Sequence, residues 1–317
     1  MDFSLTEQQR FFKGQVSRAL GRIVAPFADS IDKSDVFPGE LFRELGALGY
    51  YGIRYPSDIG GMEADCVSFT ILAEELARVS IGFAAIVTMQ CLMGTDFIFR
   101  FGNDEQRRKY LIPAIKGDKI GTIAFTEPDC GSDLGGIKTR AVKNERGYIL
   151  TGRKLWITDG DVADFVTVAA TTDPGKRLGG IGFFLVEKGT PGFSMGQKIE
   201  KMSARGAATI ELIFDDCQVP ATSLMGEEGK GAKYLNDILS EIRIMIAGLG
   251  VGLAKSAFVA GLNYARQREA FGRPIGKFQL IEEKIAEMEV RIKASELLTY
   301  NAAWLKDKGK LTGKEAA

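Results

Sequence analysis

The sequence predicts an α+β protein of three domains: a helical domain at residues 1–119, a middle β domain at 120–225 and a second helical domain at 226–317. Apolar residues recur at helical spacing in the first and last regions, and at the alternating spacing of strands between them. The strands are short, are separated by polar turns and have no helices between them. This pattern favours a small antiparallel β-barrel or sandwich.

Helix start signals support the N-terminal assignment. Thr6 and Gln9 form a capping-box pattern ahead of the first helix, and Pro38 precedes another helix. Two long apolar segments follow, at 66–77 and 81–101. The second segment is rich in Ala, Met and Phe and has few charges, so we expect a buried helix.

Alternation and turn residues place the strands of the middle domain and the helices that follow it. The expected strands cover 122–125, 138–142, 148–151, 156–158, 165–171, 181–186 and 209–214. One helix is expected from 232 to 268 and another from about 277 to 308. The glycines of 179–182 and 248–252 do not sit at a strand-to-helix turn of a βαβ unit, which argues against a dinucleotide fingerprint.

Composition excludes several classes of function. Lys plus Arg equals Asp plus Glu at 41 each, so no net field attracts nucleic acid or an anionic membrane. No uninterrupted apolar run approaches the roughly 18 residues of a membrane span. The four cysteines are widely spaced and form no CxxC pair, which predicts neither a zinc site nor a disulfide framework, and a cytoplasmic location is expected.

The sequence contains no histidine. A Ser-His-Asp triad, a Cys-His pair and a His-ligated zinc are therefore impossible within it. Acid–base chemistry must come from carboxylates, Lys, Tyr, Cys or a cofactor.

The stretch from Ile123 to Asp133 is the strongest site candidate. It begins as an apolar strand and then breaks at Pro128 and Gly131. A rigid strand that delivers the hydroxyls of Thr126 and Ser132 through an irregular loop is a usual way to build a ligand site. The alternative is a strand that ends in a solvated turn.

Three other features are ambiguous when taken singly. Trp156 and Thr158 lie two apart in a strand, so an indole and a hydroxyl share one face, which suits a flavin ring as well as core packing. Arg243 lies in an apolar helical stretch and has either a ligand or a structural ion partner. Arg268, beside Gly and Pro residues, either contacts phosphate or caps a helix.

Together these motifs resemble the acyl-CoA dehydrogenase family of flavoproteins. Residues 126–133, Thr-Glu-Pro-Asp-Cys-Gly-Ser-Asp, are similar to its T-E-P-x-A-G-S-D signature. Residues 156–158 are similar to its W-I-T-N segment, with Asp159 in place of Asn. Residues 268–279 resemble its R-x-x-F-G-x-x-I-x-x-F-Q block. Single motifs are weak, but their order and spacing run through all 317 residues.

The resemblance implies a cofactor and its contacts. FAD would bind between the barrel and the helices. Its isoalloxazine and ribityl region would contact Ile123, Phe125, Thr126, Trp156 and Thr158. Gly131 and Ser132 would meet the flavin diphosphate or the pantetheine of a thioester, and Ser132 and Arg243 are the expected substrate contacts. Arg268, Phe271 and Gln279 would reach the FAD of a neighbouring subunit, which implies a homodimer or a dimer of dimers.

The implied reaction is α,β-dehydrogenation of an acyl-CoA thioester to the enoyl-CoA. A carboxylate would remove the α-proton while the β-hydride passes to flavin N5, with hydrogen bonds to the thioester carbonyl stabilising the enolate. An electron-transferring flavoprotein would reoxidise the flavin.

The catalytic base is where the resemblance departs from this sequence. The family's usual Glu belongs to the C-terminal helical region, beyond Ala317, so we expect the natural chain to continue with a Glu there. Some members instead place Glu directly before the residue that matches Arg243, a position held here by Ile242. Glu241 is adjacent, but one helical step turns it by about 100°.

Two further hypotheses stay open from the sequence. A relative with this fold can act on a carrier-protein thioester or as a flavin monooxygenase, which oxygen-dependent hydroxylation without an enoyl product would reveal. A catalytically silent homologue would serve as a binding or assembly subunit, and such a protein would purify colourless and refuse added FAD.

Overall fold

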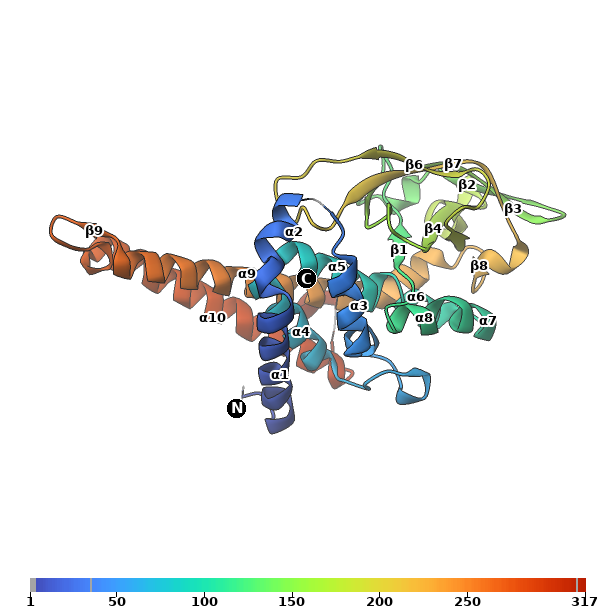
Figure 1. The fold of residues 1–317 in the computed structure, drawn as a ribbon. Helices are drawn as coiled ribbons and strands as arrows, with labels where there is room; N and C mark the ends of the chain where they lie inside the picture. The colour runs from blue at the N-terminus through green and yellow to red at the C-terminus, as the bar shows by residue number, and fades with distance from the viewer. Residues whose placement is uncertain (1–3, 35, 312) are drawn as a thin grey trace. The chain divides into compact units, whose positions relative to one another are not determined.

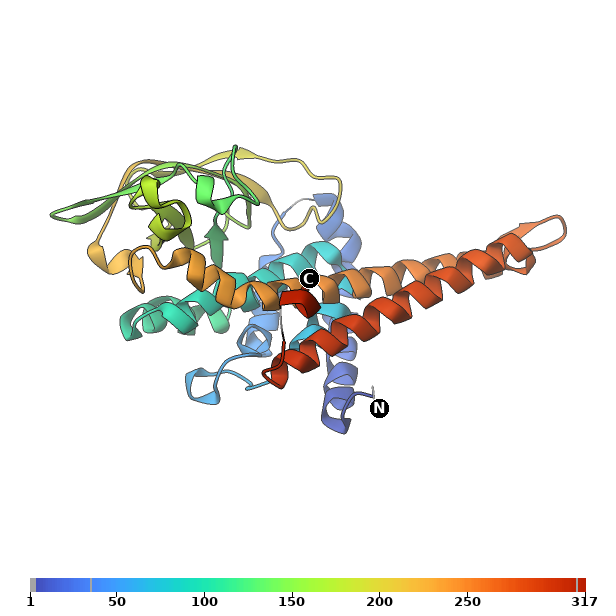
Figure 2. The same cartoon turned by 180° about the vertical axis from the view of Figure 1, so that it is seen from behind.

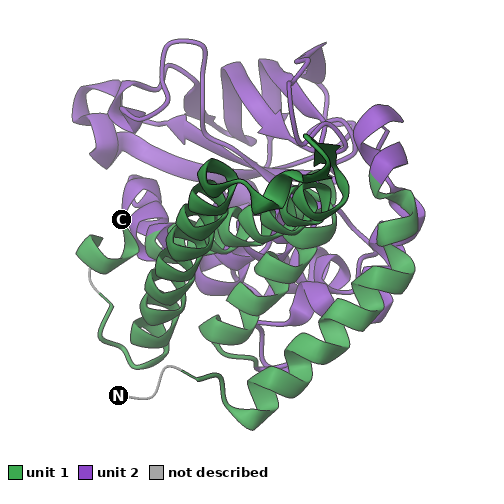
Figure 3. Cartoon of the chain, turned by 90° about the vertical axis from the view of Figure 1, so that its left-hand side faces the viewer, with its two compact units in different colours: residues 1–28, 64–84, 240–317 green, residues 29–63, 85–239 purple. Residues whose placement is uncertain are grey.

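The computed structural model describes residues 4–34, 36–311 and 313–317. The chain forms two compact units (Figure 3). The first unit comprises residues 1–28, 64–84 and 240–317, and the second comprises 29–63 and 85–239. The predicted class is confirmed: helices at the start, a β domain in the middle and helices at the end of the chain.

The first unit is built on a long helical hairpin. Helices α9 (Gly231–Gln267), from Ser240 on, and α10 (Gln279–Asp307) run side by side, and the short strands β9 (Glu269–Ala270) and β10 (Arg273–Pro274) close their far end (Figures 1 and 2). Helix α4 (Cys66–Val79) packs against α10 and against α1 (Glu7–Ile23). A short helix, α11 (Gly313–Ala316), ends the unit.

Local sequence signals explain how these helices begin and pack. The capping box of α1 is confirmed: Thr6 Oγ1 accepts from the Gln9 amide over 3.2 Å, and Gln9 Oε1 accepts from the Thr6 amide over 3.0 Å. Gly252 is needed for close helix packing, since a Cβ there would lie 2.1 Å from the Glu74 carbonyl oxygen. The glycine run of α9 therefore serves packing rather than nucleotide binding.

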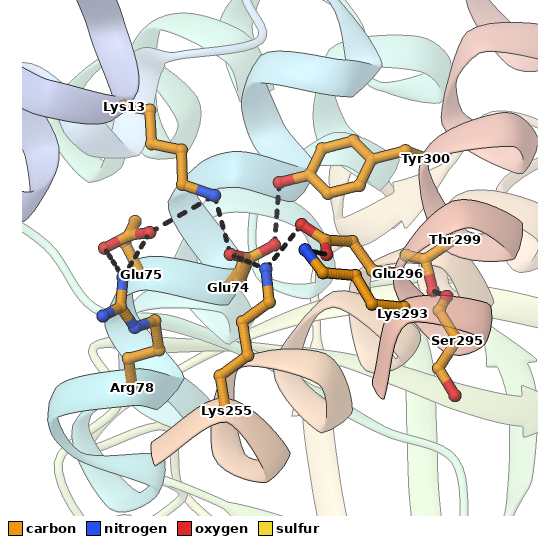
Figure 4. A network of polar contacts seen from close by, with 10 residues as sticks. All are labelled: Lys13, Glu74, Glu75, Arg78, Lys255, Lys293, Ser295, Glu296, Thr299 and Tyr300. Atoms are coloured by element: carbon orange, nitrogen blue, oxygen red, sulfur yellow. Dashed lines mark hydrogen bonds and ion pairs between the residues drawn. The ribbon is translucent and has the colours of Figure 1, made fainter. Parts of the chain in front are cut away.

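A polar network lies inside this apolar unit (Figure 4). Glu74 is 1% exposed, and its Oε1 lies 2.8 Å from Nζ of both Lys13 and Lys255. Lys255 Nζ also lies 2.6 Å from Glu296 Oε1. One buried carboxylate therefore connects α1, α4 and α9, and Glu296 extends the network to α10.

The second unit holds a sheet and several short helices. Its α-helices are α2 (Ala28–Ser34), α3 (Gly39–Ala47), α6 (Asp96–Phe101), α7 (Asp104–Gln106) and α8 (Ile112–Ile115), and α5 (Ile81–Thr88) begins in the first unit. Its strands are β1 (Gly121–Ala124), β2 (Arg140–Asn144), β3 (Gly147–Thr158), β4 (Phe165–Thr171), β5 (Ile181–Glu187), β6 (Phe193–Lys198), β7 (Thr209–Val219) and β8 (Leu224–Met225).

The sheet is mixed, which corrects the expectation of an antiparallel barrel. Within the described residues its order is β6-β7-β3-β2-β4-β5-β8, with β1 beside β4. The pairs β1–β4 and β2–β4 are parallel and the remaining pairs are antiparallel. Alternating hydrophobicity reports that a segment is a strand, but it carries no information on the direction of its neighbours.

The apolar segment 81–101 is helical, but a π-helical turn, η4 (Met89–Met93), separates α5 from α6. The Gly94 amide closes this turn by donating to the Met89 carbonyl over 2.8 Å, and the buried Thr95 hydroxyl donates to the Gln90 carbonyl over 2.6 Å. A Cβ at Gly94 would lie 2.2 Å from the Gly121 carbonyl oxygen. The irregular turn brings this helix against the start of β1.

Two helical segments in the described chain are long and apolar enough to cross a bilayer by length and composition alone, namely Ile81–Phe101 and Gly231–Gln267. The expectation from the sequence concerned apolar runs, whereas mean hydropathy over a window tolerates a few polar residues. Of the apolar window in Ile81–Phe101, 78% is buried inside the protein, as in a core helix. Only 33% is buried in Gly231–Gln267, so part of α9 is an exposed apolar surface.

Candidate functional site

The end of β1 delivers the signature loop from a buried scaffold. Ile123 and Phe125 are buried, and the Phe125 ring stacks on Phe183 with centroids 5.0 Å apart. The side chains of these two residues belong to the core, so only their main-chain groups are open to a ligand. Thr126 is half-buried at the edge of this core, and Gly131 and Ser132 are exposed.

The carboxylate of Glu127 holds the loop in shape. Its Oε2 accepts from the Lys138 amide over 2.6 Å, and its Oε1 accepts from the Thr139 amide over 3.0 Å and from Lys154 Nζ over 2.7 Å. Burial opposes ionisation of Glu127, but Lys154 and the hydrogen bonds outweigh it and lower the carboxyl pKa below its usual range. The loop is therefore closed around one ionised, buried group.

Two side-chain contacts bracket Gly131 and Ser132. Cys130, which stands where the signature has Ala, donates its thiol proton to the Asp133 carbonyl over 2.7 Å, and burial raises the pKa of that thiol. Asp133 Oδ1 and Oδ2 each accept from Arg177 Nη2 over 2.9 Å. The turn between these contacts presents the Ser132 hydroxyl to solvent.

Trp156 is strained and exposed beside this loop. Its φ is +63°, unusual for a non-glycine residue in a strand, and 54% of it is exposed. The Leu155 amide donates to the Thr126 carbonyl over 2.8 Å, so the Trp156 segment is bound to the end of β1. Ile157, the next residue, is buried, whereas Thr158 is half-buried. Strained backbone and an exposed large aromatic group together indicate a ligand site.

Asp159 follows this segment and is 2% exposed, with a φ of +56°. Burial raises its pKa to about 8, with Asp161 adding to the effect and Lys201 opposing it. Its Oδ1 has no hydrogen-bond partner among the described residues. A neutral carboxyl resembles the Asn of the motif more than a carboxylate does, because it has the same planar shape and can donate as well as accept a hydrogen bond.

The remaining predicted contacts lie in the first unit. Phe271, at the tip of the α9–α10 hairpin, is 95% exposed and has a φ of +53°. Arg268 and Gln279 flank it and are also exposed. Arg243, on α9, is exposed rather than buried, and it makes no ion pair among the described residues, so the structural ion-pair interpretation fails for it.

Glu241 has a partner within the first unit. It is 3% exposed, and its Oε1 lies 2.7 Å from Lys306 Nζ on α10. A nearby ammonium favours the charged form of a carboxylate and so weakens it as a base. This geometry favours a structural role for Glu241. The neighbouring Ile242 supplies no acid–base group.

The predicted site residues thus form two groups. Those of the β domain lie in the second unit, and those of the α9–α10 hairpin lie in the first unit. Sequence reasoning missed Lys154 and the anchoring role of Glu127. The available signal was a lysine at an inward-facing position of β3, between the alternating apolar residues of that strand.

Comparison with known proteins identifies the family of the chain. The chain matches family models described as the acyl-CoA dehydrogenase N-terminal domain over residues 6–118, middle domain over 122–217 and C-terminal domain over 229–317. The chain belongs to the acyl-CoA dehydrogenase family. It is therefore an oxidoreductase of a class that uses a flavin cofactor.

Individual relatives cover the whole chain. A benzylmalonyl-CoA dehydrogenase of Aromatoleum aromaticum is 42% identical over 100% of this chain and 84% of its own length. The butyryl-CoA dehydrogenase structure from Megasphaera elsdenii is 38% identical with a TM-score of 0.95, covering 100% of this chain and 84% of that chain. A structure titled as an electron transferring flavoprotein of Acidaminococcus fermentans, in work on flavin-based electron bifurcation, is 38% identical with a TM-score of 0.96, covering 100% and 83%.

Proposed function

We propose that this protein catalyses the FAD-dependent α,β-dehydrogenation of an acyl-CoA thioester to the enoyl-CoA. The observation that carries the proposal is Trp156, which is strained, 54% exposed and bound through its neighbour Leu155 to Thr126. An indole held in this way on a rigid strand is a suitable surface for a flat aromatic cofactor. Family membership and the printed names of the relatives support the same reaction.

The residues of the β domain fit a flavin. Trp156 is exposed, and Thr158 and Thr126 beside it are half-buried, so a planar ring bound there would meet an aromatic surface with hydroxyls nearby. Main-chain groups of Ile123 and Phe125 complete the predicted set. When bound, FAD supplies the two-electron acceptor that this chain's own side chains lack.

The substrate contacts proposed are Ser132 and Arg243. Ser132 lies on the exposed turn between the Cys130 and Asp133 contacts, where its hydroxyl and nearby amides are open to a ligand. Arg243 is an exposed cation on α9, which suits an anionic portion of a CoA thioester. The α-proton requires a carboxylate base, and the ion-paired Glu241 is a poor candidate for it.

A homo-oligomer, dimer or dimer of dimers, is proposed to complete the site. Phe271 at the hairpin tip is 95% exposed, which is costly for an isolated chain in water. Large apolar side chains also remain exposed along both helices of the hairpin: Ile246, Leu253, Val259, Leu280, Val290, Leu297 and Leu298. Many large apolar side chains exposed on two adjacent helices are typical of a subunit interface, and a second copy would bring its Arg268, Phe271 and Gln279 to a neighbour's FAD.

An electron-transferring flavoprotein is proposed as the electron acceptor, supported by the likeness to the Acidaminococcus fermentans structure. A cytoplasmic location is proposed with it, and cell fractionation tests that location. A fractionated protein that sediments with membranes after a salt wash would oppose it.

The test of function uses the two tryptophans of the chain, Trp156 and Trp304. The Trp304→Phe variant leaves Trp156 as the single fluorescent reporter, and we expect added FAD to quench it. In protein extended to its natural length, a panel of straight, branched and cyclic acyl-CoAs should then bleach the flavin anaerobically, with enoyl-CoA detected by mass spectrometry.

Two outcomes would contradict the proposal. Absence of bleaching across the panel in protein of natural length would contradict acyl-CoA dehydrogenation. Turnover of carrier-protein thioesters alone, or hydroxylated product that requires oxygen, would move the function to the corresponding alternative. The matched control is Trp156→Phe, and when both variants are compared by equilibrium dialysis, FAD affinity should fall for Trp156→Phe while Trp304→Phe retains it.

A further inference from the structure

We propose that Lys154 is a positioning residue for the flavin site: its buried ammonium ties the end of β1 to the bulge of β3 and so holds Thr126 and Trp156 in register. This inference rests on the proposed function. It adds a residue that touches neither cofactor nor substrate but sets the place of those that do.

The contacts of Lys154 are made in the interior of the second unit. Its side chain is 0% exposed, and Nζ donates to the Phe125 carbonyl over 3.1 Å and to Glu127 Oε1 over 2.7 Å. These acceptors flank Thr126 on both sides. One ammonium therefore holds the residue before Thr126 and the residue after it.

Leu155, the next residue of β3, makes a third hydrogen bond to the end of β1. The Leu155 amide donates to the Thr126 carbonyl over 2.8 Å, and Trp156 follows with its φ of +63°. The register between β3 and β7 shifts between Lys154 and Ile157, so the strand is irregular at this point. A bulge is free to adopt other local geometries unless its flanks are held. The ties from Lys154 and Leu155 supply that constraint.

Stability alone does not explain a buried pair at this position. A buried ion pair is often no better for stability than apolar residues of the same volume, because desolvation offsets the attraction. Burial lowers the pKa of Lys154 although the charge of Glu127 raises it, so desolvation is the larger of the two effects. The directional hydrogen bonds of an ammonium to one carbonyl and one carboxylate specify geometry, which apolar packing at this place does not.

The experiment compares Lys154→Met with Lys255→Met, a buried-pair control in the first unit. Lys255 is 19% exposed and bonds Glu74 and Glu296, none of which is a predicted flavin contact. Both variants are made in full-length Trp304→Phe protein. FAD affinity is measured by quenching of Trp156, the environment of bound flavin by its visible absorption spectrum, and folding by thermal unfolding of the apoprotein.

We expect Lys154→Met to weaken FAD binding by tenfold or more and to alter the spectrum of the flavin that still binds. Lys255→Met should lower the unfolding temperature and leave both flavin readouts unchanged. Lys154→Arg, which keeps the charge and can donate to both acceptors, should recover part of the affinity.

The inference would be overturned if Lys154→Met bound FAD with the affinity and the flavin spectrum of the wild-type protein. A parent that binds no FAD overturns the proposed function instead, so the two failures are distinct. Should Lys154→Met fail to fold, Lys154→Met/Glu127→Leu removes both charges and answers the same question: unchanged FAD affinity in that variant would also overturn the inference.

Discussion

The hydroxyl of Tyr300 donates a hydrogen bond to Glu74 Oε2 over 2.8 Å, which joins α10 to α4 through a buried carboxylate (Figure 4). Burial opposes ionisation of Glu74, but Lys13 and Lys255 outweigh it, and the carboxyl pKa lies below its usual range. The same environment raises the pKa of Tyr300, chiefly by burial and then by the charge of Glu74. Glu74 is thus an ionised acceptor with donors from three other helices.

Removal of this hydroxyl should destabilise the first unit. Tyr300→Phe leaves Glu74 with its two lysines but without one hydrogen bond to a charged group, a loss of about 2 kcal/mol. Urea unfolding followed by circular dichroism measures it. Tyr264→Phe is the matched control, because Tyr264 is 60% exposed on α9 and should change stability by less than about 0.5 kcal/mol. Equal effects of the two substitutions would contradict the role given to Tyr300.

Asp159 should make the stability of the second unit depend on pH. Its folded pKa of about 8 lies above the value of 3.8 expected in an unfolded chain, so the folded state binds the proton more tightly. Between these two pH values stability falls as pH rises, by about 1.4 kcal/mol per pH unit at most. Above about pH 8 both states are ionised and the loss is complete.

Asp159→Asn removes this dependence. The variant should unfold at a higher urea concentration than the parent near pH 8, and the difference should shrink as pH falls toward 4. Asn also tolerates the positive φ at this position, so backbone strain is not introduced. A difference that stays constant from pH 5 to pH 8 would show that Asp159 does not titrate as described.

Glu241 should prove structural. Glu241→Gln removes the charge that pairs with Lys306 Nζ, and because the Lys306 side chain is 34% exposed, we expect a loss of only about 1 kcal/mol. Flavin bleaching by substrate should stay within about threefold of the parent, because a proton-abstracting base contributes at least about 100-fold. Bleaching reduced 100-fold or more at unchanged stability would instead identify Glu241 as the base.

The control for this pair is Lys306→Met. In the structural interpretation, it should destabilise the first unit at least as much as Glu241→Gln, because it takes the ammonium from a carboxylate whose side chain is only 4% exposed, and the double variant should cost less than the sum of the two. Additive losses would indicate that the two side chains do not interact in solution.

Phe271 should matter to assembly and not to folding of the single chain. Its ring contacts Phe278 at a centroid distance of 6.1 Å but is otherwise open, so Phe271→Ala removes little packing within the chain. We expect thermal unfolding to change by only about 1–2 °C, with a shift toward smaller species in analytical ultracentrifugation and weaker FAD binding. An unchanged assembly and FAD affinity would place the subunit contact elsewhere.

Local signals in the sequence determined much of the fold. The capping residues Thr6 and Gln9 act within one turn, and the alternation of 165–171 coincides with β4. The Thr126–Asp133 and Trp156–Thr158 motifs pointed to two segments that lie side by side in the β domain, where the Leu155 amide donates to the Thr126 carbonyl. Such features depend on neighbours close in the chain, so residue types and spacing suffice to predict them.

Tertiary structure alone decided the features that depend on distant partners. Strand direction in the mixed sheet, the π-helical turn beside Thr95, and β6, whose sequence lacks a strong apolar alternation, were not predictable from local pattern. The signature loop is the clearest case. Its sequence determined that Thr126 and Ser132 follow a strand, whereas its shape depends on Lys154, 27 positions from Glu127 and buried against it. Burial and charge pairing are properties of the folded interior, and they fixed how the site is held.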